Sequence, residues 1–571
     1  LAKIRKAFMD KLWMPAKGYV GGWVEQGGHE RVHEDGWLYA TFCPIDAGLL
    51  DSGQAASALY RTEWDLEREH MPYGGQRCWT SNWVPSKWSL REMWPGDNYH
   101  LALSYFQTGL ADDGWELLRG TFPCMALYGP VPGDMGYPSG GTDFNDCASM
   151  FCRTVVEGLF GYRPDYPNGV VTIAPQLPSA WDHASIRTPD VSLDVRQGKY
   201  QIELTQPAEM DLRLPVRARK LVAVTLNGRP VNWELVPGFG CSVAKIAVPK
   251  SKSALVELSC EQPLPQYAPV AVEMRVGEKP DLSARDATKI IKTASPPTTA
   301  GYHLAESLVQ AGDAPQRRLF KIKVTDPAAD AARAAQGFDK PPAGARWVPV
   351  DLSHQFNGDV RAIFQQQYLS PRPPTCSLRL ATDGYSTWQM MLSKDNKPPT
   401  IDLSDVPALL DRQNHLLTPV GIPFAWVGGD RNIAFTSMWD NWPRQASVPV
   451  NRKAEGISFL LCGFTNPMQG RIANAELRLT YSDGIVERIE LIPPLNFWSM
   501  CGFGGSDYDY KRDGFCLPTV PPSTVRLGRN CRAVILNHRL RTDVTLNSVT
   551  LETFSQEVII GLMGMSLMDS K

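Results

Sequence analysis

The spacing of apolar residues changes near Val170, and this change separates two regions that must fold differently. Before it, apolar residues recur every three or four positions, as Cys147, Phe151 and Val155 do, which is the pattern of one buried helix face. After it, runs such as VVTIAP, VSLDV and YQIELTQ alternate apolar and polar residues, which is typical of strands with one buried face. Because 571 residues are too many for one core, we expect several domains.

Residues 1–165 are predicted to be helices joined by long loops rich in glycine and tryptophan. A first helix runs from about Ala2 to Trp13, and WPGDN begins another over 99–108, since Asp or Asn can cap free backbone N–H groups. GYPSGGTDFNDCASMF then opens as a loop and becomes a helix, which ends before Pro164 because proline cannot continue it. This alternation of hairpins and long loops is typical of stacked α-hairpins.

The remaining chain is predicted to be mostly strands. Residues 166–263 form a first β-sandwich, residues 264–345 a mixed segment with a Pro- and Ala-rich linker, and residues 346–571 a second β-sandwich. Within the last region, LRLTYSDGIVERIEL is the clearest hairpin, because Asp483 and Gly484 provide a tight turn. Four tryptophans there are candidates for stacking on sugar rings, with core packing of most of them as the simpler expectation: Trp388, Trp439, Trp442 and Trp498.

Composition and charge exclude several classes of function. A net charge of −2 provides no basic excess for nucleic acid or an anionic membrane. The most apolar run, 558–568, is too short to span a bilayer, and no signal peptide is visible. The 12 cysteines include no C-x-x-C pair, and His29 and His33 have no third ligand at a suitable spacing. We therefore predict no metal and no cofactor.

Four motifs occur in an order that resembles a known family. GGQRCW, WELLRG, VVEGLFGYRPD and NGVVTIAPQLPSAW follow one another between residues 74 and 181. They look like the last hairpins, and the β domain behind them, of the six-hairpin (α/α)6-barrel glycosidases, the group of glucoamylases and cellobiose and chitobiose phosphorylases. The resemblance implies a fold in which residues 1–165 are the C-terminal half of an (α/α)6 toroid and residues 166–263 close the catalytic module. ISFLLCGF, LRLTYSDG and NFW make residues 346–571 resemble the galactose-binding-like β-sandwiches of bacterial carbohydrate enzymes.

A count of helices extends the expectation that comes from the resemblance. A complete ring of this family holds twelve helices, and we place about six before Pro164. The resemblance therefore implies an upstream segment that supplies the other half of the ring, either in the same polypeptide or as a bound partner chain. It also implies that the general acid, which lies in the middle of the family's barrel, precedes Leu1.

Aspartates in the loop before the last predicted helix are candidates for catalysis. Hydrolysis of a glycosidic bond requires one carboxyl group that protonates the leaving oxygen and another that activates water or attacks carbon. In glucoamylase-like members the base lies in this loop, which here holds Asp134 and Asp143; a turn or cap residue is the alternative for Asp143. Phosphorylases carry small residues for phosphate at this place, whereas Asp143 and Asp146 would repel phosphate. This departure favours hydrolysis.

Glu92 is the third catalytic candidate. It lies between Trp88 and Trp94, where desolvation would raise its pKa as a general acid needs; the alternative is a surface helix residue. The loops 18–39 and 73–94 are longer than hairpin connections require, so we expect them at one mouth of the helical region. The candidate substrate-binding residues are His33, Glu34, Asp35, Trp37, Trp79, Trp83, Trp94 and Asp146.

These residues predict a glycoside hydrolase that acts on a poly- or oligosaccharide. The sequence leaves the sugar, the linkage and the choice between retention and inversion open, and a periplasmic or secreted location suits such an activity. A polysaccharide lyase is one alternative, in which Arg91, Tyr99 and His100 would matter more than the aspartates. A non-catalytic carbohydrate-binding or scaffold chain is the other, and its carboxylates need not converge.

Overall fold

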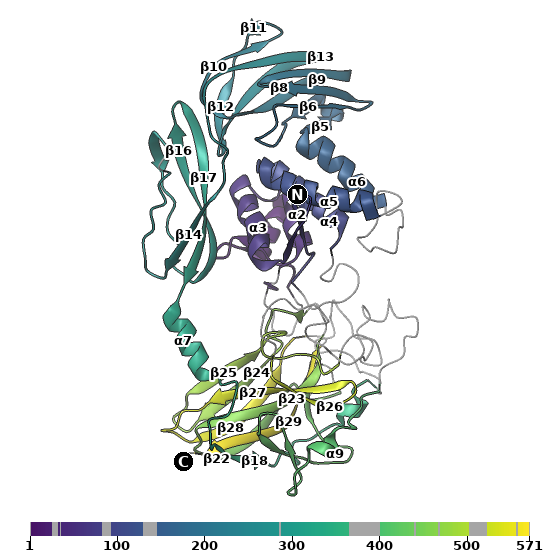
Figure 1. Cartoon of the computed structure of the whole chain (residues 1–571), viewed down its shortest axis with the longest axis vertical. Helices are drawn as coiled ribbons and strands as arrows, with labels where there is room; N and C mark the ends of the chain where they lie inside the picture. The colour runs from purple at the N-terminus through teal and green to yellow at the C-terminus, as the bar shows by residue number, and fades with distance from the viewer. Residues whose placement is uncertain are drawn as a thin grey trace. The chain divides into compact units, whose positions relative to one another are not determined.

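The computed structural model describes residues 2–24, 32–34, 36–82, 93–128, 145–284, 287–364, 400–438, 441–465, 469–501, 522–555 and 558–569. They form two compact units (Figure 1). Unit 1 comprises Leu1–Val20, Gly36–Thr80 and Met93–Asp326, and unit 2 comprises Gly21–Asp35, Ser81–Glu92 and Pro327–Lys571.

The helices of unit 1 begin and end at residues that favour those positions. α3 (Ser52–Asp65) has a capping box, in which the Asp51 carboxylate accepts from the Gln54 N–H at 2.8 Å and the Gln54 Oε1 accepts from the Asp51 N–H at 3.0 Å. α4 (Pro95–Thr108) starts with proline and ends at Gly109, whose φ of 92° lies in the left-handed region. The other helices are α1 (Ala2–Leu12), α2 (Leu38–Asp46), α5 (Ala111–Tyr128) and α6 (Asn145–Arg153), which continues as the π-helix η1 (Thr154–Leu159).

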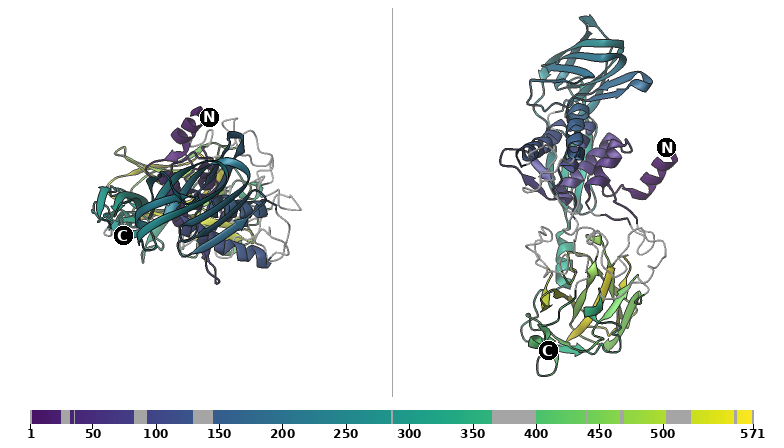
Figure 2. Two further views of the ribbon diagram at one scale, coloured as in Figure 1. Left: turned by 90° about the horizontal axis from the view of Figure 1, so that it is seen from above. Right: turned by 90° about the vertical axis from the view of Figure 1, so that its right-hand side faces the viewer.

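α4 is the centre of the helical part of unit 1. Its side chains are buried on nearly every side, which is the pattern of a helix surrounded by other elements. Phe42 of α2 stacks on His100 of α4 with ring centroids 4.0 Å apart. Asp46, at the end of α2, accepts a hydrogen bond from Gln107 near the end of α4, so the two helices run in the same direction. α1 has no buried residue and projects from unit 1 (Figure 2).

A 13-stranded sheet forms the rest of unit 1 (Figure 1). Its longest strands, β9 (Lys199–Val216) and β13 (Ser242–Pro263), run antiparallel, and buried residues alternate with exposed ones along β9. The other strands of this sheet are β5 (Tyr162–Asp165), β6 (Val170–Ile173), β7 (His183–Arg187), β8 (Val191–Arg196), β10 (Ala218–Leu226), β11 (Arg229–Pro230), β12 (Glu234–Phe239), β14 (Val270–Arg275), β15 (Lys289–Lys292), β16 (Gly301–Ala311) and β17 (Ala314–Thr325). Short elements of unit 1 are β1 (Trp13–Met14), β2 (Tyr19–Val20), β3 (Arg68–His70), β4 (Gln76–Cys78) and η2 (Tyr166–Asn168).

β13 bends so strongly that its two ends pair with almost adjacent residues. Ser242 at its start pairs with Val216 of β9, whereas Pro263 at its end pairs with Ala218 of β10. The register between β13 and β9 is irregular between residues 248 and 253 of β13, and such bulges bend a strand. The sheet therefore curls back on itself.

Two sheets of unit 2 share a hydrophobic core. β23 (Gly456–Thr465) is buried at all ten positions because it is covered on both faces: Ile457 and Phe459 belong to one core and Leu460 and Cys462 to another. The elements of unit 2 are α7 (Pro327–Gln336), β18 (Arg346–Val350), η3 (Val360–Ala362), α9 (Val406–Leu409), β19 (His415–Leu417), β20 (Pro423–Ala425), β21 (Ala434–Ser437), β22 (Gln445–Arg452), β24 (Ala475–Tyr481), β25 (Val486–Leu491), β26 (Thr524–Gly528), β27 (Cys531–Arg539), β28 (Leu546–Thr553) and β29 (Val558–Asp569).

The predicted hairpin of this region is confirmed: β24 pairs antiparallel with β25, and Gly484 between them has a φ of 85°. Trp442 and Trp498 are each 6% exposed and lie in cores. Trp388 and Trp439 lie outside the described residues, so core packing of most of the four tryptophans stays a prediction. In the described part of the chain, no helix has the length and apolar character needed to cross a membrane.

The predicted fold class, a partial (α/α)6 toroid followed by β-sandwich domains, is wrong. Strands hold more of the described residues than helices do, and the largest element is the curled 13-stranded sheet. The prediction gave most weight to the helical motifs of residues 1–165, whereas β14, β16 and β17 arise from a stretch in which proline and alanine suggested a mixed segment. The argument for a missing half-ring no longer applies, because it assumed the toroid.

Candidate functional site

Three tryptophans lie near the starts of α2 and α4 in unit 1. Trp37 is the residue before α2, and Trp94 is the residue before α4. Trp79 follows β4, and the Leu38 N–H donates to the carbonyl of Thr80 at 3.0 Å. The chain after β4 therefore lies against the start of α2.

The buried side-chain amide of Asn98 joins the end of β4 to α4. Its Nδ2 donates to the carbonyls of Cys78 and Trp94, both at 2.9 Å, and its Oδ1 accepts from the Cys78 N–H at 2.7 Å. Such a bonded amide fixes the backbone around it, because each lost bond would leave a buried polar group unpaired. The backbones that carry Trp37, Trp79 and Trp94 are thus brought together, and we call this group the tryptophan edge.

The members of the tryptophan edge differ in exposure. Trp94 is 4% exposed, so its indole is packed into the core. Trp37 and Trp79 are partly exposed, which leaves ring surface that a ligand can contact. The three sequence candidates are therefore adjacent in the fold, and Trp37 and Trp79 are the two suited to direct contact.

His33 and Glu34 lie in unit 2. His33 is fully buried, its ring stacks on Trp23 with centroids 4.1 Å apart, and its backbone N–H donates to the carbonyl of Trp23 at 2.8 Å. Glu34 is exposed. Of the described residues of the second long loop, only Ser81 and Asn82 belong to unit 2, where Arg471 Nε donates to the carbonyl of Asn82 at 3.1 Å. A common mouth for the two loops stays a prediction.

The catalytic assignment rests on residues that the structure does not describe. Asp146 belongs to the first turn of α6, but its side chain is not described. The roles proposed for these side chains stay predictions. Outside the described residues lie the catalytic candidates Asp134, Asp143 and Glu92 and the substrate-binding candidates Asp35 and Trp83.

Asp46 is the centre of a polar cluster that the sequence analysis missed. Arg153 donates to both Asp46 oxygens, each at 2.7 Å, and His100 and Gln107 lie at hydrogen-bonding distances of 3.2 and 2.9 Å. Burial disfavours the charge on Asp46, but hydrogen bonds from these partners outweigh burial and hold its pKa well below the usual range. Since His100 is engaged here and Tyr99 is fully buried, their positions do not favour a lyase base. Asp46 and its partners come from three helices, α2, α4 and α6, so no local spacing reveals the cluster.

A second cluster joins α3 and α5 to β17. The Tyr60 hydroxyl donates to Asp113 Oδ2 at 2.9 Å, and Lys321 Nζ donates to Glu63 Oε2 at 2.8 Å. Burial, with the nearby charge of Glu63, raises the pKa of Asp113 to about 6. Asp113 also lines a cavity of about 310 Å³ at the start of α5. This carboxyl group can exchange a proton near neutral pH, a property that structural and functional sites share.

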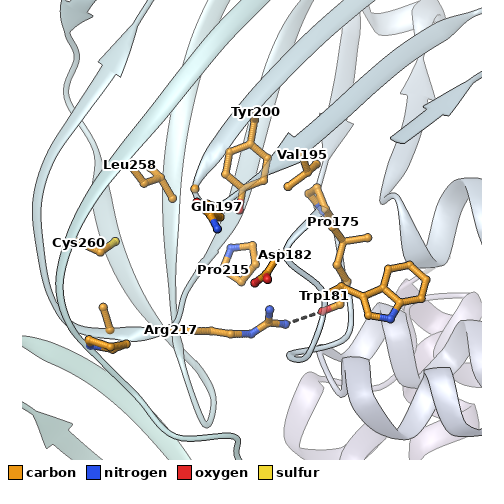
Figure 3. A pocket seen from close by; sticks show the side chains of 14 residues that line it. Pro175, Trp181, Asp182, Val195, Gln197, Tyr200, Pro215, Arg217, Leu258 and Cys260 are labelled. Carbon is orange, nitrogen blue, oxygen red and sulfur yellow. Dashed lines mark hydrogen bonds between the residues drawn. The ribbon is translucent and has the colours of Figure 1, made fainter. Parts of the chain in front are cut away.

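A larger cavity, of about 540 Å³, lies where the ends of the curled sheet meet (Figure 3). Its lining includes Trp181, Asp182, Tyr200 and Arg217. The sequence analysis used Trp181 only within a family motif and did not single out the other three. They lie on different strands and loops, and only the curl of the sheet brings them together.

No family model matches the sequence, and no curated protein matches it. Among solved structures, the chain is similar to the cycloalternan-forming enzyme from Listeria monocytogenes in complex with a pentasaccharide substrate, at 8% identity and a TM-score of 0.14 over 70% of this chain and 22% of that chain. It is also similar to a GH127 β-L-arabinofuranosidase from Geobacillus stearothermophilus T6, at 12% identity and a TM-score of 0.20 over 50% of this chain and 60% of that chain. A third similar structure contains CBM51-2 of Clostridium perfringens ZmpB with GlcNAc, at 10% identity and a TM-score of 0.13 over 53% and 47% of the two chains. These neighbours are carbohydrate-active or carbohydrate-binding proteins, and similarity at this level defines no family.

Proposed function

We propose that this chain belongs to a glycoside hydrolase that cleaves a poly- or oligosaccharide by carboxylate acid–base catalysis. The observation that carries the proposal is the tryptophan edge of unit 1. Indole rings pack against the apolar faces of sugar rings, and Trp37 and Trp79 are partly exposed residues on backbone segments that are hydrogen-bonded to each other. One candidate carboxylate adjoins this region in the sequence, since Glu92 is two residues before Trp94, and a second, Asp143, is two residues before α6.

The division of labour follows from the chemistry of the glycosidic bond. Glu92 is the candidate acid that protonates the leaving oxygen, because indole neighbours would disfavour its charge. Asp134 or Asp143 is the candidate that activates water or attacks the sugar carbon. Glu34, Asp35, Trp83 and Asp146 stay sequence-based candidates for sugar binding, and Glu34 is exposed; the buried His33 is proposed to support its loop. All the groups in this proposed mechanism are side chains of this protein.

The test measures reducing ends released from a panel of soluble neutral polysaccharides, such as starch, a β-glucan and an arabinan. We expect Glu92→Gln, and either Asp134→Asn or Asp143→Asn, to lower the rate at least about a hundredfold, because acid–base groups contribute at this scale. The matched control is Glu69→Gln, since Glu69 is an exposed carboxylate on β3, and it should keep its activity.

Two results would contradict the proposal. One is release of sugar that none of the three substitutions reduces, because the carboxylates would then have no role in the reaction. The other is product that absorbs near about 235 nm, a property of the unsaturated sugars that elimination forms, which would support the lyase alternative. Binding of a polysaccharide without turnover would instead support a non-catalytic chain.

A further inference from the structure

The cavity where the ends of the curled sheet meet has walls from several strands and loops of unit 1, among them β13 with Leu258 and Cys260 (Figure 3). Trp181 and Asp182 come from the loop after β6, Tyr200 from β9, and Gln197 from the turn before β9. The Gln197 N–H donates to the carbonyl of Asp182 at 3.2 Å, so the loop and the turn are joined to each other. The cavity is therefore framed by bonded backbone.

Arg217 is held at the base of this cavity. Its Nη2 donates to the carbonyl of Leu177 at 2.6 Å, and a guanidinium has further N–H groups for a ligand. Figure 3 shows the guanidinium and the Asp182 carboxylate pointing toward the middle of the cavity. Within the described residues, the side chains of Asp182 and Gln197 are exposed and make no hydrogen bond to protein. The cavity thus offers both donors and acceptors that protein groups do not saturate.

Two aromatic side chains complete the lining. The Trp181 ring packs edge to face against Trp115 of α5, with centroids 4.7 Å apart, and this contact restrains its orientation. Tyr200 is 5% exposed, and burial raises its pKa to about 12, although the charge of Arg217 acts in the opposite direction. Its hydroxyl therefore keeps its proton at neutral pH.

We propose that this cavity binds a neutral saccharide of one or two sugar residues. Sugars combine an apolar ring face with a rim of hydroxyl groups that donate and accept, and the lining provides aromatic rings together with Arg217, Asp182 and Gln197. Arg217 and Asp182 are the charged side chains among the lining residues, and their charges cancel, which removes a preference for phosphate or a uronic acid. A volume of about 540 Å³ lies within the usual range of small-ligand sites.

This site is distinct from the tryptophan edge and requires none of the candidate catalytic carboxylates. Its lining residues lie between 175 and 263, whereas the tryptophan edge consists of residues 37, 79 and 94. Binding here can be measured without turnover. Absence of hydrolysis and absence of binding are therefore separate results.

The experiment uses Cys260, an exposed cysteine in the wall of the cavity. The full chain is treated with N-ethylmaleimide at about pH 8, where free thiols begin to ionise, and modification of each cysteine is followed by peptide mass spectrometry. Maltose, cellobiose and lactose are the neutral probes, and digalacturonate and inorganic phosphate are the anionic ones. At least one neutral disaccharide should slow modification of Cys260 severalfold and leave the exposed Cys152 of α6 unchanged.

Substitution of Asp182 tests whether the protection comes from the cavity. Asp182→Asn should raise the disaccharide concentration that gives half-maximal protection about tenfold, because it removes a charged acceptor for hydroxyl groups. The matched control is Asp190→Asn, since Asp190 is exposed in the same sheet region but is not a lining residue. Both variants should have the melting temperature of the protein without a substitution, because neither carboxylate is buried.

Three results would overturn the proposal. The first is that no neutral disaccharide slows Cys260 modification at concentrations up to roughly 50 mM, well above a weak Kd of about 1 mM. The second is protection by digalacturonate or phosphate alone. The third is equal protection of Cys260 in the protein without a substitution and in a folded Asp182→Asn variant.

Discussion

Asp46 and Asp113 are both withdrawn from solvent in unit 1, but their pKa values move in opposite directions. Asp46 accepts hydrogen bonds from Arg153, Gln107 and the His100 ring, and its pKa is lowered despite burial. Asp113 accepts a hydrogen bond from the Tyr60 hydroxyl, and its pKa is raised to about 6. The comparison teaches that burial alone does not set the charge of a carboxyl group, because the number and charge of its donors decide the sign.

The largest effect is expected from removing Asp46. Asp46→Ala should lower the free energy of unfolding by about 2–4 kcal/mol at neutral pH, because Arg153 loses a partner that binds it through two hydrogen bonds. Urea unfolding measures the change. Asp10→Ala is the control, since Asp10 forms an exposed pair with Lys6 and such pairs contribute less than about 1 kcal/mol. Equal effects of the two substitutions would remove the structural importance assigned to the Asp46 cluster.

Asp113 should behave in the opposite way. Its folded pKa of about 6 lies above the unfolded value near 4, so its stabilising contribution is complete below about pH 4 and is lost as the pH rises through 6. Asp113→Asn should therefore stabilise the protein by about 1–2 kcal/mol at neutral pH and flatten this part of the stability profile. Thermal unfolding between about pH 4 and 8 provides the measurement. An unchanged slope over this window would contradict the raised pKa.

Acid should reveal the contribution of Asp46 to stability. The lowered pKa of Asp46 gives stability that is present above about pH 4, the unfolded value, and is lost as the pH falls through the folded pKa. The acid-induced loss of stability should therefore be smaller in Asp46→Asn than in the unmodified protein.

Gln107→Leu, which removes one of the donors to Asp46, should cost about 1 kcal/mol at neutral pH. Urea unfolding at acidic and at neutral pH measures both effects. A cost from Gln107→Leu as large as that from Asp46→Ala would mean that packing, and not the hydrogen bond, dominates.

The smallest effect is expected at Tyr60. Its hydroxyl hydrogen bond lowers the pKa of Asp113, so Tyr60→Phe should raise that pKa further while costing less than about 1 kcal/mol of stability. A carbon-detected NMR titration of the Asp113 carboxyl group gives the pKa directly. A fall in this pKa would show that the hydroxyl does not act as the donor.

Local spacing predicted several elements of the fold but not the way they join. The helix from Ala2, the helix over 99–108 and the turn at Gly484 were all accessible, because local spacing and glycine act on immediate neighbours. The predicted cap at Asp97 or Asn98 was wrong, since α4 already begins at Pro95 and both residues lie inside it. The curled sheet was not, because it depends on the pairing of Pro263 with Ala218 and on an irregular register within β13. Many distant segments have the same alternation of apolar and polar residues, so the sequence does not decide which of them pair.

The candidate sites show the same division. The sequence by itself determined that tryptophans and carboxylates are concentrated in the loops before α4 and α6, since residue type and order are properties of the chain. Tertiary structure alone decided that Asn98 joins the backbone of Cys78 to α4, that His33 is buried on Trp23, and that Arg217 and Tyr200 line one cavity. The physical reason is that hydrogen bonding and burial act over a few ångströms in space, whatever the separation along the chain.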